Sequence, residues 1–324
     1  MIKPPVAFLD IYPPRYLAVI ERHLPADFAL RMIKTFDAAE VRAAIADVEF
    51  IFVGGELKVD GDLLDKAPQL KLLLKRGVGY DKIDVPAATE RKVTVCITPV
   101  FEASVSVAEH ALALLMAVLR QLGHMDDVVK NGGWRRQIVL PTYQLYGKTV
   151  GIMGMGAIAR EVAKRLRPFG VNVRYYDVCR QPPEKEQELG ITYVPSPDAV
   201  FAGADIVTMH TPLTPETRNS AGGKQFMSMK KNGIFINCSR GEVIDEPALV
   251  EALQSGHLAG AGLDVLPKEP PAKDNALLEM DNVILSPHWA VGDVDTIISQ
   301  INHAFTNIRR FMKGEAIPAS DIAK

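Results

Sequence analysis

The sequence predicts an α/β protein built from two doubly wound parallel sheets, and three observations support this prediction. The chain has 324 residues, enough for two domains that each bury a sizeable core. Its strand-like segments are short and continuously apolar rather than alternating, which is typical of strands covered on both faces of a parallel sheet. Helical patterns separate these segments, as the crossover connections between parallel strands require.

The first series of elements ends at about residue 98. Apolar runs rich in β-branched residues predict strands, and helical patterns lie between them. The expected strands are Val6–Leu9, Phe50–Val53, Leu70–Leu74 and Val93–Ile97. The expected helices lie around Ala38–Ala46, Asp62–Ala67 and Pro86–Arg91. Together these elements predict one α/β unit.

A second series of elements begins near Lys148. The expected strands are Val150–Met153, Val171–Tyr176, Ile206–Met209, Ile234–Asn237, Gly260–Asp264 and Val283–Leu285. Helical segments again separate them. A run of six strands with intervening helices is long enough for a complete doubly wound domain.

Two long helical patterns, Ser104–Leu122 and Val294–Lys313, flank the second series. The later one returns the chain toward its N-terminal partner, which predicts a discontinuous first domain and boundaries near Pro99 and Gly292. A cleft is expected between the two lobes, which two crossings of the chain join. The predicted domains are residues 1–99 with 292–324, and residues 100–291.

Composition and charge exclude several classes of protein. The chain has 37 Lys+Arg against 39 Asp+Glu, so it lacks the clustered basic excess that nucleic acid or an anionic membrane would require. The longest apolar run, Ala111–Leu119, is shorter than the roughly 20 residues that cross a bilayer and predicts a buried helix. The cysteines Cys96, Cys179 and Cys238 have no disulfide or zinc spacing, and the N-terminus shows no signal segment. A reducing cytoplasm is expected, with no metal site.

A Gly-x-Gly-x-x-Ala pattern follows the strand Val150–Met153 and opens the helix Ile158–Leu166. Gly154 permits a tight turn, Gly156 lets the backbone approach a pyrophosphate, and Ala159 lets the helix pack closely on the strand. The N–H groups and the dipole at the start of the helix would then hold phosphates. Glycines in a strand-to-helix turn are also often only structural, so the pattern needs its context.

The next strand supplies that context, because it ends in Asp177, 23 positions after Gly154. A carboxylate at this place can accept hydrogen bonds from an adenosine ribose and would repel a 2′-phosphate, which favours NAD over NADP. Arg174 and Arg180 lie close in sequence and could weaken that preference. The alternative interpretation of Asp177 is a solvated carboxylate at a strand end.

Several further segments occur in a fixed order over about residues 50–290: Arg76–Asp84, Ser106–His110, the Gly154 turn, His210–Thr217, Asn237–Gly241 and Ser286–His288. With this set the sequence resembles the D-isomer-specific 2-hydroxyacid dehydrogenases, a family that includes glyoxylate/hydroxypyruvate reductases, phosphoglycerate dehydrogenases, D-lactate dehydrogenases and formate dehydrogenase. The resemblance implies two Rossmann-like domains, a flavodoxin-like substrate domain and an NAD-binding domain, with substrate and nicotinamide meeting in the cleft. It also implies a homodimer built on the cofactor domain.

Hydride transfer to a 2-oxo acid needs a cation for the carboxylate, an acid for the carbonyl oxygen and a carboxylate that keeps this acid charged. Arg240 follows a predicted strand at the carboxyl edge of the sheet, where such folds bind ligands, and its guanidinium can bind a carboxylate through two hydrogen bonds. His288 follows another strand at the same edge and exchanges protons near neutral pH. Glu269, in the Pro267–Pro271 loop, would hydrogen-bond the imidazole and favour its charged form.

Arg240, Glu269 and His288 match the catalytic positions of the family one for one. A surface or capping charge at Arg240 and a solvated acid at Glu269 are the alternatives without that context. The other histidines are less suited to catalysis. His210 is expected to orient the turn that follows it, His110 lies beside Glu109 in a helix, and no partner is identifiable for His23, His124, His257 and His303.

The resemblance also implies binding residues. The backbone N–H groups of Val78 and Gly79 would hold the substrate carboxylate together with Arg240, and Arg76 would either add positive field or point to solvent. Asp264 would accept a hydrogen bond from the nicotinamide carboxamide. The implied cofactor contacts are Gly154, Met155, Gly156, Ala157, Ile158, Asp177, Thr211, Thr217, Cys238, Ser239, Arg240, Asp264, His288 and Ala290. A nucleophilic Cys238 is an alternative, but no His or Asn motif pairs with it.

The sequence departs from the family pattern near the expected pocket. Val100-Phe101-Glu102 stand where a Gly and an Asn are common, and Trp289 replaces a small or aliphatic residue after the catalytic His. Phe101 and Trp289 could narrow the pocket, and Glu102 would oppose a second anionic group. The expected function is hydride transfer between NAD(H) and a small D-2-hydroxy acid or 2-oxo acid. The alternatives are a dinucleotide-sensing, corepressor-like binding protein, and oxidation of formate or phosphite, although formate dehydrogenases use Gln in place of Glu269.

Overall fold

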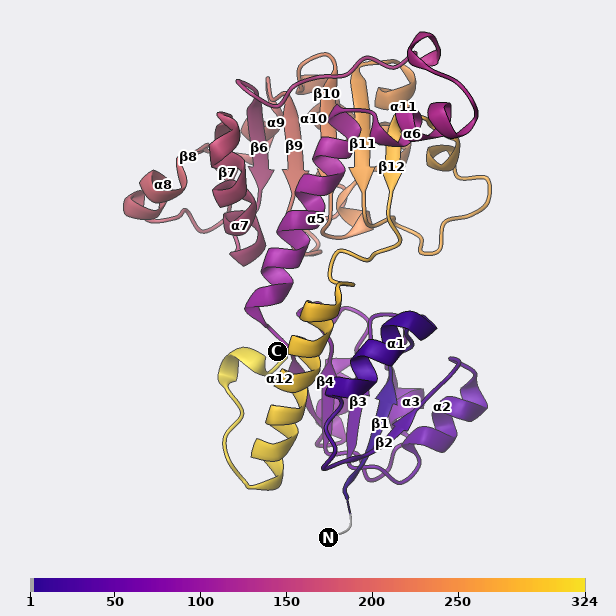
Figure 1. Cartoon of the computed structure of the whole chain (residues 1–324). Coiled ribbons are helices and arrows are strands. Elements are labelled where there is room, and N and C mark those ends of the chain that lie inside the picture. Colours follow the sequence, from indigo (N-terminus) through magenta and orange to yellow (C-terminus); the bar gives the residue numbers. More distant parts are fainter. Residues whose placement is uncertain (1–2, 324) are drawn as a thin grey trace. The chain divides into compact units, whose positions relative to one another are not determined.

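The computed structural model describes residues 3–323, and the chain divides into two units (Figure 1). The first unit joins Met1–Ala103 to Val291–Lys324, and the second is the continuous segment Ser104–Ala290. Each unit contains one sheet, and every strand pair in both sheets is parallel. The predicted α/β class with two doubly wound sheets is confirmed.

The first unit has a five-stranded sheet in the order β2-β1-β3-β4-β5. Its strands are β1 (Pro5–Leu9), β2 (Ala29–Met32), β3 (Phe50–Val53), β4 (Leu72–Lys75) and β5 (Thr94–Ile97). This is the flavodoxin-like strand order, in which the direction of winding reverses between β1 and β3. The central strands β3 and β4 are buried along their whole length, as continuously apolar runs require.

Helices cover both faces of this sheet (Figure 1). They are α1 (Pro14–Ile20), α2 (Ala38–Ile45), α3 (Gly61–Leu64), α4 (Val85–Glu90) and α12 (Val294–Met312), with the short 3-10 turns η1 (Glu21–His23) and η6 (Ala319–Asp321). Aspartates begin four of these helices. The side chains of Asp37, Asp60, Asp84 and Asp293 each accept a hydrogen bond from a backbone N–H of the first turn. These caps satisfy donors that the helices themselves leave unpaired.

The C-terminal helix α12 completes the core of the first unit. Phe305 stacks on Phe52 of β3 with ring centroids 6.4 Å apart, and it also contacts Phe28 at 5.1 Å. Phe52 and Phe305 are both fully or nearly fully buried. After the helix, the backbone N–H of Ala323 donates to the carbonyl of Val95 on β5. One face of the five-stranded sheet is therefore covered by residues that come almost 200 positions after it in sequence.

The second unit has a seven-stranded sheet in the order β12-β11-β10-β9-β6-β7-β8. Its strands are β6 (Thr149–Met153), β7 (Asn172–Tyr176), β8 (Ile191–Tyr193), β9 (Ile206–Met209), β10 (Gly233–Asn237), β11 (Leu258–Leu263) and β12 (Val283–Leu285). Counted from β6, this is the Rossmann order 3-2-1-4-5-6 with one further strand. The direction of winding reverses between β6 and β9, so ligands are expected above this point of the sheet.

Two observed strands are absent from the sequence-based prediction. The edge strand β2 contains an arginine and has no fully buried residue, and the edge strand β8 is only three residues long. The expectation of six strands in the second series is therefore wrong by one. Both β2 and β8 lie at an edge of their sheet and are partly exposed, so they lack the continuous apolar run that marks fully buried strands.

The helices of the second unit lie on both faces of its sheet (Figure 1). They are α5 (Phe101–Leu119), α6 (Leu122–Lys130), α7 (Ala157–Leu166), α8 (Pro183–Leu189), α9 (Pro197–Phe201), α10 (Gly223–Ser228) and α11 (Glu246–Gln254). Four short 3-10 turns accompany them: η2 (Arg135–Gln137), η3 (Arg167–Phe169), η4 (Gly241–Val243) and η5 (Ala276–Glu279).

The long helix α5 packs on β11 of the second unit. A Cβ on Gly260 would lie 2.7 Å from a methyl of Val118, and a Cβ on Gly262 would lie 3.0 Å from the Cβ of Leu114, so glycines allow the close approach. Among the described residues α5 alone is long and apolar enough to cross a membrane by length and composition, with a mean hydropathy of 1.5. Its contacts with β11 identify it instead as a core helix, as the apolar run in its second half predicts.

Candidate active site

The predicted cofactor and catalytic residues of the second unit follow the carboxyl ends of its parallel strands. The loops concerned carry Gly154 after β6, Asp177 after β7, Thr211 after β9, Arg240 after β10, Asp264 and Glu269 after β11, and His288 after β12. The carboxyl ends of parallel strands meet at one edge of a sheet. The sheet therefore brings these loops to a common edge within the second unit.

The turn after β6 has the backbone that its glycines predict. Gly154 has a φ of +83°, and a Cβ there would lie 2.8 Å from the carbonyl oxygen of His210, so only glycine fits. Gly156 begins α7, and a Cβ there would meet nothing within 4 Å. No side chain caps the first N–H groups of α7 within the described chain. An open glycine beside uncapped helical N–H groups fits a phosphate group of a dinucleotide.

Asp177 holds this turn against the end of β7. One carboxylate oxygen accepts a hydrogen bond from the Met155 N–H at 2.6 Å, and the other accepts one from the Cys179 N–H at 2.9 Å. The side chain is only partly buried. Asp177 therefore has a structural role in the turn as well as the predicted position beside an adenosine ribose.

The two arginines that lie near Asp177 in sequence both bind other groups. Arg180 makes a bidentate pair with Glu186, with both N–O distances 2.9 Å, and lies 5.1 Å over the ring of Tyr193. Hydrogen bonds, first of all from Arg180, lower the pKa of Glu186 to about 2. Arg174 donates to the carbonyl of Ala202, and burial lowers the pKa of its guanidinium. Neither arginine points an unpaired guanidinium at Asp177.

The turn after β9 contains an unsatisfied hydroxyl. Thr211 Oγ1 is buried and has no hydrogen-bond partner among residues 3–323, and the Cγ2 of the same residue would lie 3.2 Å from a Cβ on Gly154. An orphaned hydroxyl beside the phosphate turn fits a contact with the dinucleotide. Thr217, also predicted as a contact, instead uses its hydroxyl to close its own turn, donating to the Pro212 carbonyl and accepting from the Thr214 N–H, both at 2.7 Å.

His288 and Glu269 form a close pair. His288 Nδ1 lies 2.7 Å from Glu269 Oε2, and Glu269 Oε1 accepts a hydrogen bond from the Leu266 N–H at 3.1 Å. Because Nδ1 faces a carboxylate, it carries a proton, and Nε2 is the ring nitrogen that can exchange its proton with a ligand. The His288 side chain is 45% exposed, so Nε2 is accessible.

Arg240 lies in the loop after β10, next to the loop after β11 that carries Glu269. A Cβ on Gly241 would lie 2.0 Å from the carbonyl carbon of Leu266, so the glycine lets the Arg240 turn touch the loop that carries Glu269. The Arg240 carbonyl accepts a hydrogen bond from Asn237 Nδ2 at 2.8 Å, and its guanidinium donates to the Ser239 carbonyl at 2.8 Å. The three predicted catalytic residues thus follow adjacent strands β10, β11 and β12.

Asp264 is directed at the His288 loop rather than at solvent. It is 1% exposed, and its carboxylate accepts hydrogen bonds from Ser286 Oγ at 2.6 Å, from the Trp289 N–H at 2.8 Å and from the Ala290 N–H at 3.0 Å. Burial alone would raise the pKa of Asp264, but hydrogen bonds from His110, Ser286 and Trp289 hold it below its usual value. The carboxamide contact predicted for Asp264 would have to share an already occupied carboxylate.

The cysteine of the Arg240 loop is inert. Cys238 is 8% exposed, and burial raises the pKa of its thiol well above the usual value. A protonated thiol is a poor nucleophile. The geometry therefore gives no support to the alternative in which Cys238 attacks a substrate.

Several histidines have partners that the sequence does not reveal, and two of them pair with side chains of distant residues. His110 Nε2 lies 2.8 Å from Ser286 Oγ and 3.3 Å from Asp264 Oδ1. His303 Nε2 lies 2.7 Å from Asp321 Oδ2. The expectations that His110 merely neighbours Glu109 and that His303 has no partner are wrong, because both partners are distant in sequence.

The predicted substrate turn lies in the first unit. Gly77 has a φ of +87° and exchanges hydrogen bonds with Thr98, donating to its Oγ1 at 2.7 Å and accepting from its N–H at 3.0 Å. The backbone N–H groups of Val78 and Gly79 donate to no acceptor within the described part of the chain, and the Val78 side chain is 52% exposed. Two N–H donors without an acceptor in one turn fit an anionic group.

Arg76, beside this turn, neither points to solvent nor keeps an uncompensated charge. Its Nε lies 2.7 Å from Asp10 Oδ2, and the two side chains are 13% and 6% exposed. Tyr12 donates to the same carboxylate oxygen at 2.5 Å, and burial raises the pKa of the phenol. Asp10 thus pairs with Arg76 inside the unit, so the interpretation of Arg76 as an arginine pointing to solvent is wrong.

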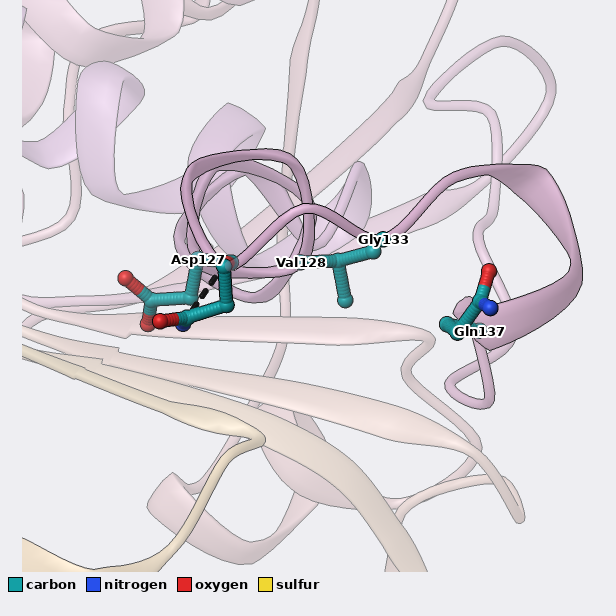
Figure 2. Close-up of a pocket in the computed structure, with 5 residues that line it drawn as sticks. Asp127, Val128, Gly133 and Gln137 are labelled. Atoms are coloured by element: carbon teal, nitrogen blue, oxygen red, sulfur yellow. Dashed lines mark hydrogen bonds between the residues drawn. The ribbon is translucent and has the colours of Figure 1, made fainter.

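A small pocket of the second unit lies elsewhere. It is formed by the end of α6 and the segment leading into η2, and it is lined by Asp127, Val128, Asn131, Gly133 and Gln137 (Figure 2). Asn131 Nδ2 donates to the Asp127 carbonyl within it at 2.8 Å. None of the predicted site residues lines this pocket.

Comparisons with known proteins agree with this arrangement. The family model for the NAD-binding domain of D-isomer-specific 2-hydroxyacid dehydrogenases matches residues 112–290. A glyoxylate reductase from Korarchaeum cryptofilum is 39% identical over 263 residues, which are 80% of this chain and 78% of that protein. A D-3-phosphoglycerate dehydrogenase from Methanocaldococcus jannaschii is 39% identical over 85% of this chain but only 52% of its own length, so the chain spans about half of that relative.

A solved structure extends the comparison to the whole chain. The NADPH-dependent glyoxylate/hydroxypyruvate reductase of Sinorhizobium meliloti, determined with citrate, is 33% identical, with a TM-score of 0.82 over 99% of this chain and 97% of that one. The fold, the ordered motifs and these matches all agree. The chain therefore belongs to the D-isomer-specific 2-hydroxyacid dehydrogenases, oxidoreductases of 2-hydroxy acids that use a nicotinamide dinucleotide, and its second unit contains their dinucleotide-binding domain.

Proposed function

We propose that this protein transfers a hydride between NAD(H) and a small 2-oxo acid, forming the D-2-hydroxy acid. The observation that carries the proposal is the 2.7 Å pair between His288 Nδ1 and Glu269 Oε2, in loops next to that of Arg240. A carboxylate-supported imidazole beside a guanidinium is the set of groups that this reaction requires.

Each residue of the set has a separate task. Arg240 binds the substrate carboxylate through its two-pronged guanidinium and polarises the neighbouring carbonyl. The nicotinamide ring, when bound, supplies the hydride for reduction or accepts it in oxidation. His288 Nε2 gives its proton to the carbonyl oxygen as that oxygen gains charge. Glu269 stabilises the charged imidazole from the Nδ1 side, and in the reverse direction the neutral imidazole takes the hydroxyl proton.

We also propose Val78 and Gly79 as substrate-binding residues, supported by two backbone N–H groups that have no acceptor among the described residues and lie in a partly exposed turn. Compensation of Arg76 by Asp10 leaves little net charge beside that turn for a second anionic group. This favours a monocarboxylate without a phosphate. The glyoxylate reductase among the relatives acts on such an acid by its name.

The residues of the second unit fit a dinucleotide. The backbone from Gly154 to Ile158 and the hydroxyl of Thr211 would hold the phosphates. Asp177 would accept hydrogen bonds from the adenosine ribose. The nicotinamide would lie against the loops after β10, β11 and β12. Those loops carry the other proposed contacts: Cys238, Ser239, Arg240, Asp264, His288 and Ala290.

NAD is proposed over NADP because of charge. A 2′-phosphate on the ribose would approach the Asp177 carboxylate, and the cations that could offset this repulsion are engaged elsewhere. Arg180 is held by Glu186 and Arg174 by the Ala202 carbonyl. The Sinorhizobium relative is NADPH-dependent by its name, so the family accommodates both cofactors and the choice depends on local residues.

Homodimerisation through the second unit and a cytoplasmic location are proposed as well. A half-exposed surface of α5 and α7 supports a homodimer. It is lined by Glu109, Leu112, Lys164, Arg165, Pro168 and Phe169. Phe169 is 40% exposed there, and an exposed aromatic side chain is typical of protein interfaces.

The cytoplasmic location is supported by the cysteines. Three free cysteines, of which two are buried, suit a reducing compartment.

The function is tested with a panel of small 2-oxo acids, following the loss of NADH or NADPH absorbance. We expect at least one acid to be reduced, faster with NADH, and expect Arg240→Ala to abolish most of that rate. Arg42→Ala, an exposed arginine on α2, is the matched control and should behave as the wild type. If the folded wild type reduces none of the acids and oxidises none of the corresponding hydroxy acids, the proposed function is wrong.

A further inference from the structure

The loop that carries His288 is held by one buried carboxylate. Asp264 accepts the His288 N–H on its backbone oxygen at 2.7 Å, while its side-chain oxygens accept the N–H groups of Trp289 and Ala290 and the hydroxyl of Ser286. Four donors from residues 286–290 thus converge on a residue that is 1% exposed. The position of the loop depends on this carboxylate.

The loop needs such support because its backbone is strained. His288 has a φ of +53°, in the left-handed region that side chains with a Cβ rarely adopt. A conformation of this kind persists only when the surrounding structure over-determines it. The proposed proton donor therefore lies in a segment that would relax if its hydrogen bonds were lost.

The helix α5 adds two further bonds to this loop. His110 Nε2 lies 2.8 Å from Ser286 Oγ, and one turn earlier Ser106 Oγ donates to the Ala290 carbonyl at 2.6 Å. The two side chains are four positions apart, so they lie on the same face of the helix. That face spans the loop from its first residue to its last.

The number of available protons determines which atom donates in the hydrogen bond between His110 and Ser286. Ser286 has one hydroxyl proton, and the 2.6 Å distance to the Asp264 carboxylate requires that proton to lie between them. The Ser286 oxygen can then only accept from the imidazole, so His110 carries a proton on Nε2. The result is a directed chain in which His110 donates to Ser286 and Ser286 donates to Asp264.

We propose that His110 is a positioning residue for the reaction: through Ser286 and Asp264 it fixes the 286–290 loop and so places the His288 imidazole. The inference rests on the proposed function for its kinetic consequence, but its structural part does not depend on any activity. His110 touches neither reacting group and acts through its hydrogen bond to Ser286 and its 3.3 Å contact with Asp264 Oδ1. Its side chain is 26% exposed, so replacement does not open the core.

The kinetic test compares His110→Phe with His110→Gln. Phe keeps an aromatic side chain without a donor, whereas the Gln amide can place an N–H near the position of Nε2. We expect Phe to lower kcat for 2-oxo acid reduction about tenfold by misplacing His288, with the KM for the acid and the NADH affinity changed by less than about twofold. Gln should recover most of the loss. His124→Phe on α6 is the matched control and should leave all three quantities unchanged.

A double-mutant cycle tests the route of the effect. Ser286→Ala removes one of the two links between His110 and Asp264, so His110→Phe should lower kcat by a smaller factor in that background than in the wild type. Multiplicative effects of the two changes would show that His110 acts by another route and would overturn the proposal.

A structural readout keeps the proposal testable whatever the substrate. Trp289 lies in the loop, and the protein has 2 tryptophans, of which Trp134 is exposed and distant in sequence. In a Trp134→Phe background, His110→Phe should make Trp289 more accessible to acrylamide, and His110→Gln should not. Hydrogen exchange at the Trp289 and Ala290 amides should accelerate in parallel.

The outcomes separate the two proposals. If the wild type reduces no 2-oxo acid, the proposed function fails, while quenching and exchange still decide the role of His110. If the wild type is active and His110→Phe matches it in kcat, in quenching and in exchange, the positioning role is wrong and the proposed function stands.

Discussion

His288 Nδ1 lies 2.7 Å from Glu269 Oε2, so the imidazole that would protonate the substrate has a carboxylate on its far side. The negative charge stabilises the protonated ring, and the proton on Nε2 is the one that is transferred. This single contact links the pH dependence of the proposed reaction to a residue in another loop.

Replacing Glu269 by Gln tests that link. The amide keeps the shape and one hydrogen bond but loses the negative charge that favours a protonated imidazole. Reduction needs a proton on His288, so the pH dependence of 2-oxo acid reduction should shift toward acid in the variant. The measurement is kcat/KM against pH for both proteins. A superimposable pair of profiles would remove Glu269 from the mechanism.

Arg240→Ala should lower kcat/KM by an amount equivalent to about 1.5–3 kcal/mol or more, because a charge-assisted contact with the carboxylate is lost. Arg240→Lys keeps the charge without the two-pronged geometry and should fall between the wild type and Ala. Steady-state kinetics on the best acid, with NADH affinity measured separately, checks this. Near-wild-type kcat/KM in the Ala variant would show that another cation binds the substrate.

Asp177→Asn should shift cofactor choice toward NADPH by about tenfold, equivalent to about 1.4 kcal/mol, since the repulsion of a 2′-phosphate disappears. Asn is used because an acceptor oxygen remains for the Met155 N–H, which keeps the turn closed. Glu186→Gln should act in the same direction by releasing Arg180. The measurement is the ratio of kcat/KM with NADH to kcat/KM with NADPH for the wild type and the two variants. A wild type that already prefers NADPH would contradict the charge argument.

Gly241→Ala should destabilise the second unit and lower activity together. The added Cβ would lie 2.0 Å from the Leu266 carbonyl carbon, so the Arg240 turn must move away from the Glu269 loop. Overpacking of this kind costs about 1–3 kcal/mol. Gly123→Ala in α6 is the control, because nothing lies within 4 Å of its Cβ. Denaturant unfolding and kcat are the two measurements, and equal values for both variants would refute the steric argument.

Asp321 should make the first unit sensitive to acid. Its carboxylate is 2% exposed and accepts hydrogen bonds from Asn307 at 2.9 Å and from His303 at 2.7 Å. Burial opposes the charge, but these bonds hold its pKa below the usual value. A depressed pKa contributes stability above the pKa of the unfolded state, and this is lost as pH falls through the folded value. Asp321→Asn should cost about 1–3 kcal/mol near neutral pH and flatten the acid limb of unfolding curves.

The sequence predicts central strands better than edges. Continuous apolar runs predict β3 and β9 at their observed bounds, because these strands are buried along their whole length. The edge strands β2 and β8 carry no such run, since part of their surface is exposed. The family, predicted from the ordered motifs, is confirmed by the matching family model and relatives.

Contacts between residues far apart in sequence mark the limit of that prediction. Short motifs locate Gly154 and Asp177 because only one helix and one strand, α7 and β7 with the short turn η3, separate them. The Arg76–Asp10 pair spans 66 positions, and the His110–Ser286 contact spans 176, so no local pattern reveals either partner. The sequence does show that Ser106 and His110 are four residues apart, which places both side chains on one face of a helix.

The way α12 completes the first unit has a consequence for biosynthesis. The ribosome makes Ser104–Ala290 before Phe305, so the second unit has its whole chain while the first still lacks one covering helix. Until α12 has been made, one apolar face of the five-stranded sheet, including Phe52, lacks the helix that covers it. Domains tend to fold as units once their chain is complete, and an uncovered sheet invites association with other chains. The N-terminal unit, although it is made first, therefore exposes apolar surface for longer than the second unit during synthesis.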